Sequence, residues 1–209
     1  LIMCGIIGIY CKPKHIQGSC VNGLHAGLKY MQNRGYDSAG IVTIQEKLPV
    51  IHKYASTDTD DALTKLQETL PQHISSTIGF GHTRWATHGS KTDNNSHPHK
   101  SNQGIFTLVH NGIIDNYAFI KVELLNNGYT FYSETDTEII CNYLEYTFLK
   151  KYESVTNMNM NTKEKLAESE YEKLILETIE EVQTKMSGSW GLVIFSSYAP
   201  DRLFCVRHG

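Results

Sequence analysis

The chain has 209 residues, of which 40% are hydrophobic and 20% are charged, and its formal net charge is −3. This length and composition suit one globular domain over residues 1–209 with a sizeable core. The balanced charge, without a basic run, speaks against a nucleic-acid or membrane-surface partner, and no apolar stretch approaches the ~18 residues that cross a bilayer.

The five cysteines are irregularly spaced: Cys4, Cys11, Cys20, Cys141 and Cys205. An odd number at such spacing is poor material for a disulfide framework. Because no signal peptide is recognisable either, we expect a reducing, cytoplasmic setting.

Periodicity predicts the elements of the first half of the chain. They are a strand at 4–10, a helix from 21 to about 33, strands at 39–45 and 50–54, a helix around 63–70 and a strand at 77–83. Asp58 or Thr59 is the expected N-cap of the second helix, and Pro71 is expected to end it.

The second half begins with a polar, aperiodic segment. We expect a long loop at 84–104, a strand at 105–109, helices at 117–126, 136–150 and 174–187, and strands at 190–195 and 203–206. The segment around Met158, rich in Asn and Met, is predicted to be an exposed, poorly ordered insertion. Strands and helices come in groups rather than in strict alternation, which favours antiparallel sheets with helices outside them.

The start of the chain places a thiol at the beginning of a strand. If Met3 is removed as the initiator, Cys4 carries a thiol and a free α-amine on one residue. An α-amine titrates near ~7.7–8.0 and can accept the thiol's proton. We interpret residues 1–3 as an extension that, while attached, acylates the nitrogen of Cys4. The alternative is that Cys4 is a small buried residue at a strand start.

Two further segments carry residues suited to a small ligand. Arg84 can hold a carboxylate through two parallel N–H bonds, and Trp85 beside it can cover a ligand, with Gly89 supplying flexibility. The alternative is a solvent-exposed arginine beside a core tryptophan. In segment 34–40, small residues allow close backbone approach and Arg34 can pair with Asp37; the alternative is an ordinary turn after a helix.

Two more motifs each allow a structural and a functional interpretation. Asn111 and Gly112 together are the strongest short hairpin signal, but their carboxamide and backbone N–H can also form an oxyanion hole. Segment 133–138 has the residues of a helix N-terminus, and its Asp136 can also bind an ammonium group.

The histidines of the polar loop do not predict a metal centre. The spacing of His88, His97 and His99 matches no zinc pattern, and Pro98 restricts their convergence. We therefore expect no metal site.

Five motifs, in order along nearly the whole chain, resemble one family. They are Met3-Cys4-Gly5-Ile6, RGYDSAG (34–40), HTRWATHG (82–89), HNGII (110–114) and SETDTE (133–138). They closely resemble the glutaminase domains of glutamine–fructose-6-phosphate aminotransferases. The resemblance implies an α+β fold of the N-terminal nucleophile hydrolase class, a four-layer α/β/β/α sandwich of two antiparallel sheets.

The resemblance also implies a role for each matching residue. It makes Cys4 the nucleophile, with its α-amine as base, and Asn111 and Gly112 the oxyanion hole. In the substrate site, Arg84 would bind the glutamine α-carboxylate and Asp136 the α-amine. Trp85 with Thr87, His88 and Gly89 would form a closing loop, and Arg34 would support the nucleophile's surroundings. No cofactor and no metal are implied.

The implied reaction is hydrolysis of L-glutamine to glutamate and ammonia through a γ-glutamyl thioester. The ammonia would pass to a C-terminal sugar isomerase domain, absent from these residues, that makes glucosamine 6-phosphate from fructose 6-phosphate in hexosamine synthesis. The full-length enzyme is expected to be a homo-oligomer.

Two alternatives stay open. One is the glutaminase domain of an amidophosphoribosyltransferase, although Tyr36 and Trp85 favour the sugar enzyme and Gln32-Asn33 leans the other way. The other is a catalytically silent glutamine-binding module in which residues 1–3 stay attached to Cys4.

Overall fold

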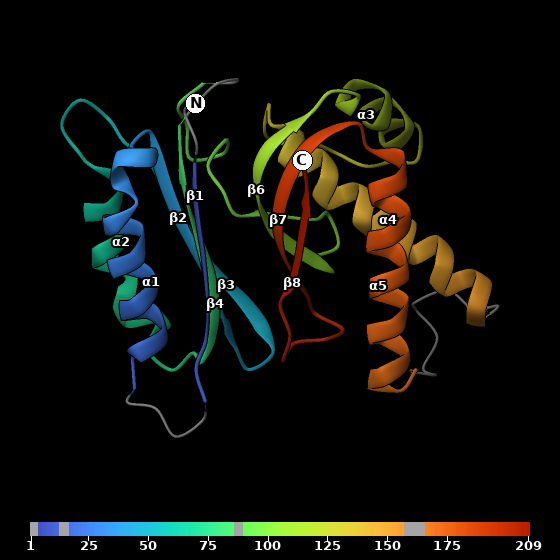
Figure 1. The fold of residues 1–209 in the computed structure, drawn as a ribbon, viewed down its shortest axis with the longest axis horizontal. Helices are drawn as coiled ribbons and strands as arrows, with labels where there is room; N and C mark the ends of the chain where they lie inside the picture. Colours follow the sequence, from blue (N-terminus) through green and yellow to red (C-terminus); the bar gives the residue numbers. More distant parts are fainter. Residues whose placement is uncertain (1–3, 13–16, 86–89, 157–165) are drawn as a thin grey trace.

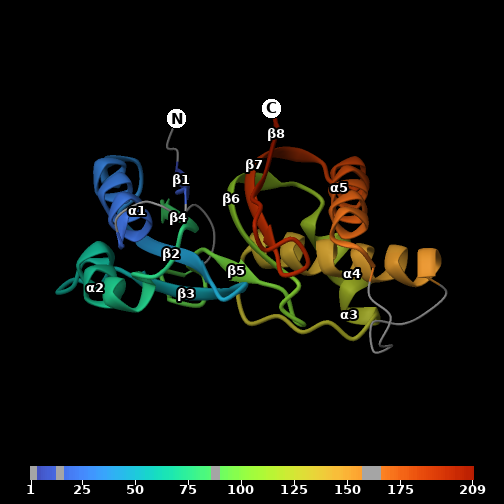
Figure 2. The same cartoon turned by 90° about the horizontal axis from the view of Figure 1, so that it is seen from below.

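The structure is a computed structural model that describes residues 4–12, 17–85, 90–156 and 166–209. Two four-stranded sheets form its middle layers, and helices cover their outer faces (Figures 1 and 2). Every strand pairing is antiparallel. The predicted four-layer sandwich is therefore confirmed.

The first sheet has the strand order β1-β4-β2-β3 and is covered by two helices. Its elements are β1 (Gly5–Tyr10), α1 (Ser19–Tyr30), β2 (Ser38–Gln45), β3 (Leu48–Ala55), α2 (Ala62–Thr69) and β4 (Ile78–Arg84), with 3-10 helices at Gln32–Arg34 and Leu70–His73. These bounds agree with the predicted ones to within a few residues.

Two local details of this half differ from prediction. The N-cap of α2 is Asp61, whose carboxylate accepts a hydrogen bond from the Thr64 N–H at 3.1 Å, so the predicted Asp58 or Thr59 cap is wrong. The turn between β2 and β3 is also tighter than expected. Glu46 and Lys47 both adopt positive φ, which lets two residues reverse the chain.

The second sheet has the order β5-β6-β7-β8. Its elements are β5 (His99–Lys100), β6 (Phe106–Ile114), α3 (Tyr117–Asn126), α4 (Asp136–Thr156), α5 (Glu168–Lys185), β7 (Gly188–Ser196) and β8 (Phe204–His208). The two-residue strand β5 lies inside the segment predicted to be wholly loop. The insertion predicted around Met158 lies outside the described residues.

Strand β6 continues through Asn111 and Gly112, so the hairpin interpretation of that dipeptide is wrong. The two residues pair with Gly191 and Trp190 of β7. Gly112 has φ +140°, and a Cβ there would lie 2.0 Å from the carbonyl oxygen of Ser189. A long-range ladder thus overrides the local turn preference, and glycine is needed because the neighbouring backbone comes so close.

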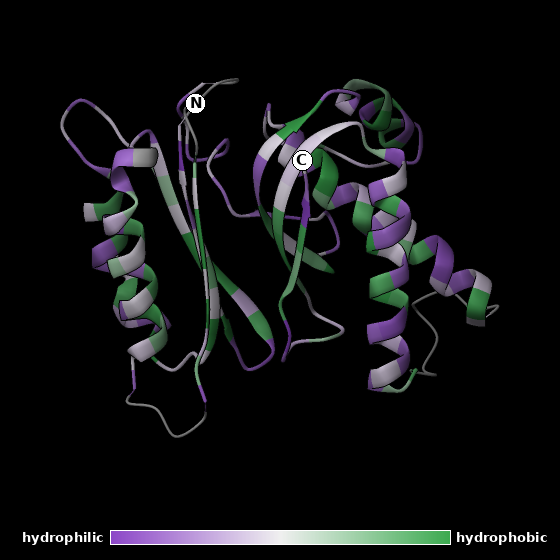
Figure 3. Cartoon of the chain, viewed as in Figure 1, coloured by the Kyte–Doolittle hydropathy of each residue, from purple (hydrophilic) through white to green (hydrophobic). Residues whose placement is uncertain are grey.

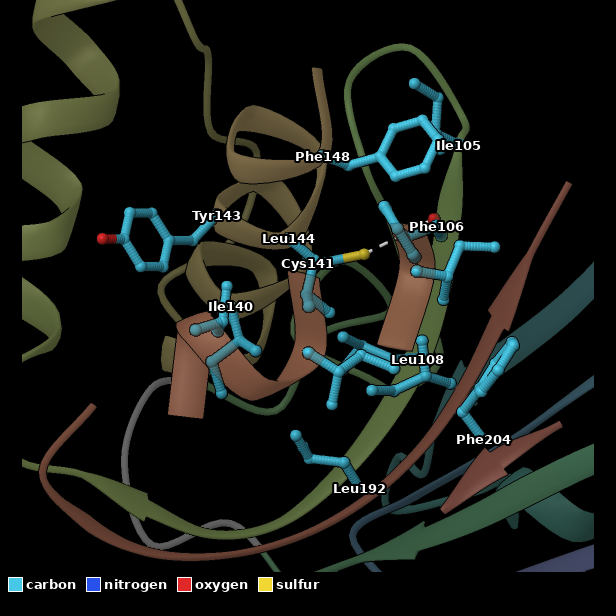
Figure 4. Close-up of a cluster of buried hydrophobic side chains, with 14 of the residues drawn as sticks. Ile105, Phe106, Leu108, Ile140, Cys141, Tyr143, Leu144, Phe148, Leu192 and Phe204 are labelled. Carbon is cyan, nitrogen blue, oxygen red and sulfur yellow. Dashed lines mark hydrogen bonds between the residues drawn. The ribbon is translucent and has the colours of Figure 1, made fainter. Parts of the chain in front are cut away.

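Three apolar clusters fill the three interfaces between the four layers. The cluster between the second sheet and α4–α5 is the largest of the three and includes Phe106, Leu108, Cys141 and Phe148 (Figure 4). A second lies between α1–α2 and the first sheet. The third lies between the sheets and contains Val42, Ile44, Ile78, Phe80, Val109, Val193 and Phe195.

The helices of the outer layers carry hydrophobic and hydrophilic residues together, which suits elements with one face on a sheet (Figure 3). Among the described helices, none is both long and apolar enough to cross a membrane.

Candidate active site

The side-chain alternation of two strands aims polar groups at one end of the space between the sheets. On β4, Ile78, Phe80, His82 and Arg84 share one face, because residues two apart in a strand point to the same side. Val109 and Asn111 do the same on β6. On β4 the shared face changes from apolar to polar along its length, and on β6 the apolar Val109 is followed on that face by the polar Asn111. These two polar ends meet near Cys4, at the start of β1.

One pocket brings together most of the described residues predicted for the site. Cys4, Arg84, Trp85, Gly112 and Asp136 all line it. Asn111 lies beside it, because its Nδ2 donates a hydrogen bond to the Cys4 carbonyl oxygen at 2.8 Å. Residues far apart in the sequence thus converge on the thiol.

The Cys4 thiol is held against the backbone of Trp85. The Trp85 N–H donates to Sγ at 3.3 Å, and the thiol lies 3.8 Å from the Trp85 carbonyl oxygen. Burial raises the pKa of the Cys4 thiol, although the Trp85 backbone and the positive charge of Arg84 act in the opposite direction. The thiol is therefore protonated at neutral pH, so a base must take its proton when it attacks.

The pocket offers one buried cation. Arg84 ends β4 and is only 7% exposed, so the alternative of a solvent-exposed arginine is wrong. Burial lowers the pKa of its guanidinium, while the neighbouring Cys4, Asp37 and Asp136 raise it. An arginine stays charged in such a setting, so this group can bind a carboxylate.

The pocket also offers an anion at the first residue of α4. Asp136 accepts a hydrogen bond from the Ile114 N–H at 3.0 Å, and its other oxygen lies 3.6 Å from Nδ1 of His110. Burial acts to raise the pKa of Asp136, but the interactions with His110, Ile114 and Thr137 outweigh it, and the net pKa is lowered. The carboxylate is ionised at neutral pH and suits an ammonium group.

Seven further residues line the pocket that were not predicted as site residues: His97, His110, Ile113, Tyr117, Glu134, Thr135 and Thr137. Glu134, Thr135 and Thr137 belong to the 133–138 motif, and His110 and Ile113 belong to the 110–114 motif, so these two motifs were the available signals. Glu134 Oε2 accepts from the Ser90 N–H at 3.0 Å and from Asn95 Nδ2 at 3.0 Å. These hydrogen bonds lower the pKa of Glu134 and tie α4's N-terminal segment to the loop before β5.

The glycines of segment 34–40 allow the close approach that was predicted. A Cβ on Gly40 would lie 1.9 Å from the His97 carbonyl oxygen, and one on Gly35 would lie 2.7 Å from the Arg84 backbone. Nearby, the Tyr36 and Trp85 rings pack edge to face, with their centroids 4.9 Å apart. Asp37 forms a salt bridge with Lys91. Thr87, His88 and Gly89, as well as the side chain of Arg34, lie outside the described residues.

Buried histidines surround this end of the sandwich. The ring centroids of His82 and His97 lie 4.2 Å apart, and those of His97 and His99 lie 5.2 Å apart. Burial lowers the pKa of all three. Within the described ranges, no group of histidine, cysteine and acidic residues has the arrangement of a metal site.

Comparison with known proteins gives one matching family and many curated relatives. A family model described as "Glutamine amidotransferase domain" matches residues 68–159. Glutamine–fructose-6-phosphate aminotransferase of Buchnera aphidicola is 36% identical over 99% of this chain, and that of Caldanaerobacter subterraneus is 37% identical over 98%. A probable enzyme of the same name from Acanthamoeba polyphaga mimivirus is 35% identical. The chain spans about 29% of the Buchnera relative.

Solved structures share the fold at lower identity. The chain is similar to a glutamine phosphoribosylpyrophosphate amidotransferase from B. subtilis, with a TM-score of 0.63 and 21% identity over 92% of this chain and 35% of that one. A second structure, described as the allosteric regulatory enzyme of purine biosynthesis, gives a TM-score of 0.65 at 20% identity with the same coverage.

Proposed function

Because the chain belongs to the glutamine amidotransferase domain family, we propose that it hydrolyses L-glutamine to glutamate and ammonia through a γ-glutamyl thioester on Cys4. One observation carries this proposal: a single pocket holds a thiol, a buried guanidinium and an ionised carboxylate. Glutamine carries the complementary groups, namely one reactive carbonyl, one carboxylate and one ammonium.

The two charged groups are proposed to orient the substrate. Arg84 binds the α-carboxylate through paired N–H donors, and Asp136 binds the α-ammonium. With both charged groups of the α-carbon held, the side-chain amide at the other end of glutamine is presented to Sγ of Cys4, which lowers the entropic cost of the attack. Trp85, with Thr87, His88 and Gly89, is proposed to close over the ligand, and Arg34 to support the surroundings of Cys4.

The chemistry follows from the groups around Cys4. Its α-amine takes the thiol proton as sulfur bonds to the amide carbon, and the carbonyl oxygen becomes an oxyanion. The Asn111 carboxamide and the Gly112 N–H are proposed to donate to that oxyanion. The intermediate collapses by breaking the carbon–nitrogen bond, and the ammonium proton passes to the departing nitrogen, which leaves as ammonia. Water then hydrolyses the thioester to glutamate and restores the thiol.

This mechanism requires a free α-amine on Cys4, so we propose that residues 1–3 are removed in the active protein. The raised pKa of the Cys4 thiol supports the need for a base of this kind, because the thiol does not ionise by itself at neutral pH. Retention of residues 1–3 would leave a glutamine-binding module without activity.

The fate of the ammonia is proposed from the curated relatives. They carry the name glutamine–fructose-6-phosphate aminotransferase at 35–37% identity, whereas the phosphoribosylpyrophosphate enzyme matches at 21%. This difference supports fructose 6-phosphate as acceptor. The chain spans about 29% of the Buchnera relative, which supports a further, sugar isomerase domain in the full-length protein. We also propose that the full-length protein is a homo-oligomer. All five cysteines are free, which supports a cytoplasmic setting.

The test is glutamate release from glutamine by protein whose first residue is Cys4. Cys4→Ala should lower kcat by about 10⁶-fold, as loss of a nucleophile does. Cys205→Ala, at an exposed cysteine on β8, is the matched control and should keep full activity. An alanine variant of Cys4 as active as wild type contradicts the proposal. Activity that is absent with residues 1–3 attached and present without them supports the role of the α-amine.

A further inference from the structure

His82 lies in the buried polar region next to the nucleophile but does not line the pocket. It is 1% exposed and pairs across the first sheet with Ile6 of β1 and Gly40 of β2. Its Nε2 lies 2.8 Å from Oδ1 of Asn111. A side chain of the first sheet thus contacts the proposed oxyanion donor of the second sheet.

The hydrogen bonds fix both the amide orientation and the histidine tautomer. The Cys4 carbonyl oxygen can only accept, so the group of Asn111 that faces it at 2.8 Å must be Nδ2. Oδ1 therefore faces His82, and because Oδ1 also only accepts, the proton of His82 is on Nε2. The chain of donors runs from His82 through Asn111 to the residue that carries the nucleophile.

We infer that His82 is a positioning residue that holds the Asn111 carboxamide with its N–H groups toward Cys4, an inference that rests on the proposed function. Turning the amide over would place Oδ1 against the Cys4 carbonyl and Nδ2 against the N–H of His82, so both contacts would become repulsive. One N–H of Asn111 bonds to Cys4, and the second is the donor available to an oxyanion.

His82 does not serve as the base for the thiol. The contacts of Sγ within the described residues are with the backbone of Trp85, not with the imidazole. The pKa of His82 is lowered to about 3, chiefly by burial, so the ring stays neutral at physiological pH. Its proton on Nε2 is a fixed donor to Asn111 rather than one that is exchanged in each cycle.

The experiment measures glutamine hydrolysis in the protein at its natural length, with variants of His82 and Asn111. Asn111→Ala removes the oxyanion donor and should lower kcat about 10²–10³-fold. His82→Leu removes only its alignment and should lower kcat about tenfold with KM for glutamine unchanged. In the Asn111→Ala background, His82→Leu should have no further effect, because the carboxamide it aligns is gone.

Two amide variants keep the test decisive if His82→Leu does not fold. Gln places its amide nitrogen near the position of the histidine Nε2, whereas the amide nitrogen of the shorter Asn falls near Nδ1. His82→Gln should therefore stay within about threefold of wild type, and His82→Asn should lose about tenfold, although the two residues are equally polar. Alkylation of Cys4 by iodoacetamide, a displacement that forms no oxyanion, should proceed at the wild-type rate in every variant.

Equal losses from His82→Leu in the wild-type and Asn111→Ala backgrounds would overturn the inference, as would equal activity of the Gln and Asn variants. An active wild type with a fully active His82→Leu variant would overturn this inference and leave the proposed function standing. A wild type that releases no glutamate would overturn both.

Discussion

The space between the two sheets has two ends of opposite character, built by the same strands. At one end, Phe80 of β4 and Val109 of β6 pack in an apolar cluster with Phe195 of β7. Two residues further along each strand, His82 and Asn111 form a buried hydrogen bond instead. One period-2 step thus separates stabilising core from candidate site.

The same sandwich therefore provides both an apolar core that stabilises the fold and a polar region that forms the candidate site. Apolar side chains at the first end contribute to stability through burial and tolerate no water. At the second end, buried polar groups cost free energy unless each is hydrogen-bonded, so histidine, asparagine and threonine side chains there bond to one another. The two ends should therefore respond differently to pH and to substitution.

The largest expected difference is in the response to acid. Burial keeps His82, His97 and His99 neutral, with pKa values below the ordinary 6.5. Because the unfolded chain binds these protons more readily, their contribution to stability is complete above pH 6.5 and is lost as the pH falls toward the folded-state values. From pH 8 to pH 5 we expect a loss of about 2 kcal/mol per histidine, or about 6 kcal/mol for the three.

Urea unfolding at the two pH values measures this loss. His99→Gln cannot be protonated at that position, so its loss should be smaller than that of the wild type by about 2 kcal/mol, the share of one histidine. Equal stability of the wild type at pH 8 and pH 5 would contradict the assignment of neutral buried rings.

A substitution at the apolar end should affect stability and spare chemistry. Phe195→Ala removes a fully buried ring from the cluster between the sheets and should cost about 3–5 kcal/mol of unfolding free energy. Phe119→Ala is the matched control, because this ring is 82% exposed and its loss should cost less than about 0.5 kcal/mol. Where Phe195→Ala is still folded, its KM for glutamine should equal that of the wild type; a raised KM would show that the two ends are not independent.

A substitution at the polar end should do the reverse. Asp136→Asn removes the proposed partner of the glutamine ammonium and should raise KM about 10–100-fold, the loss of about 1.4–3 kcal/mol expected for a charge-assisted hydrogen bond. Asp115→Asn, at an exposed aspartate just after β6, is the control and should leave KM unchanged. Steady-state kinetics decide the matter, and similar KM values for the two variants would remove Asp136 from the substrate site.

The smallest expected effect lies in the outer layer, away from both ends. Asp61→Ala removes the cap of α2 and should cost about 1 kcal/mol of stability without changing kcat or KM. Asp58→Ala should cost almost nothing, because Asp58 does not cap the helix. Thermal unfolding of the two variants compares them directly, and a larger loss from Asp58→Ala would return the cap to the position expected from sequence.

Local patterns predicted most elements because they depend on neighbours in the chain. The apolar spacing around Leu63 and Leu66 identified α2, and the residues of 133–138 identified the start of α4 at Asp136. The prediction was wrong where distant partners decide. The Asn111–Gly112 turn signal gave way to pairing with β7. The α2 cap is a different kind of error, because Asp61 accepts from the N–H of Thr64, only three residues away.

The same division holds for the candidate site. Its chemistry was readable from residue types, because a thiol near the chain start, an arginine at a strand end and an aspartate at a helix start each have a limited set of uses. Glu134 and His82 were not predicted as site residues, although they lie within the 133–138 and 82–89 motifs. Nothing in a motif says which of its side chains will face the nucleophile.

By itself, the sequence determined the order of most elements and the five motifs, since helical and strand periodicity and residue chemistry are local properties. The resemblance of those motifs to one family then implied the fold class. Only the tertiary structure decided that β4 and β6 bring the polar ends of their faces together, so that His82 meets Asn111 and Asn111 meets Cys4. The physical reason is that strand register and sheet stacking arise from contacts between residues far apart in the sequence, such as Asn111 and Cys4, which are 107 positions apart.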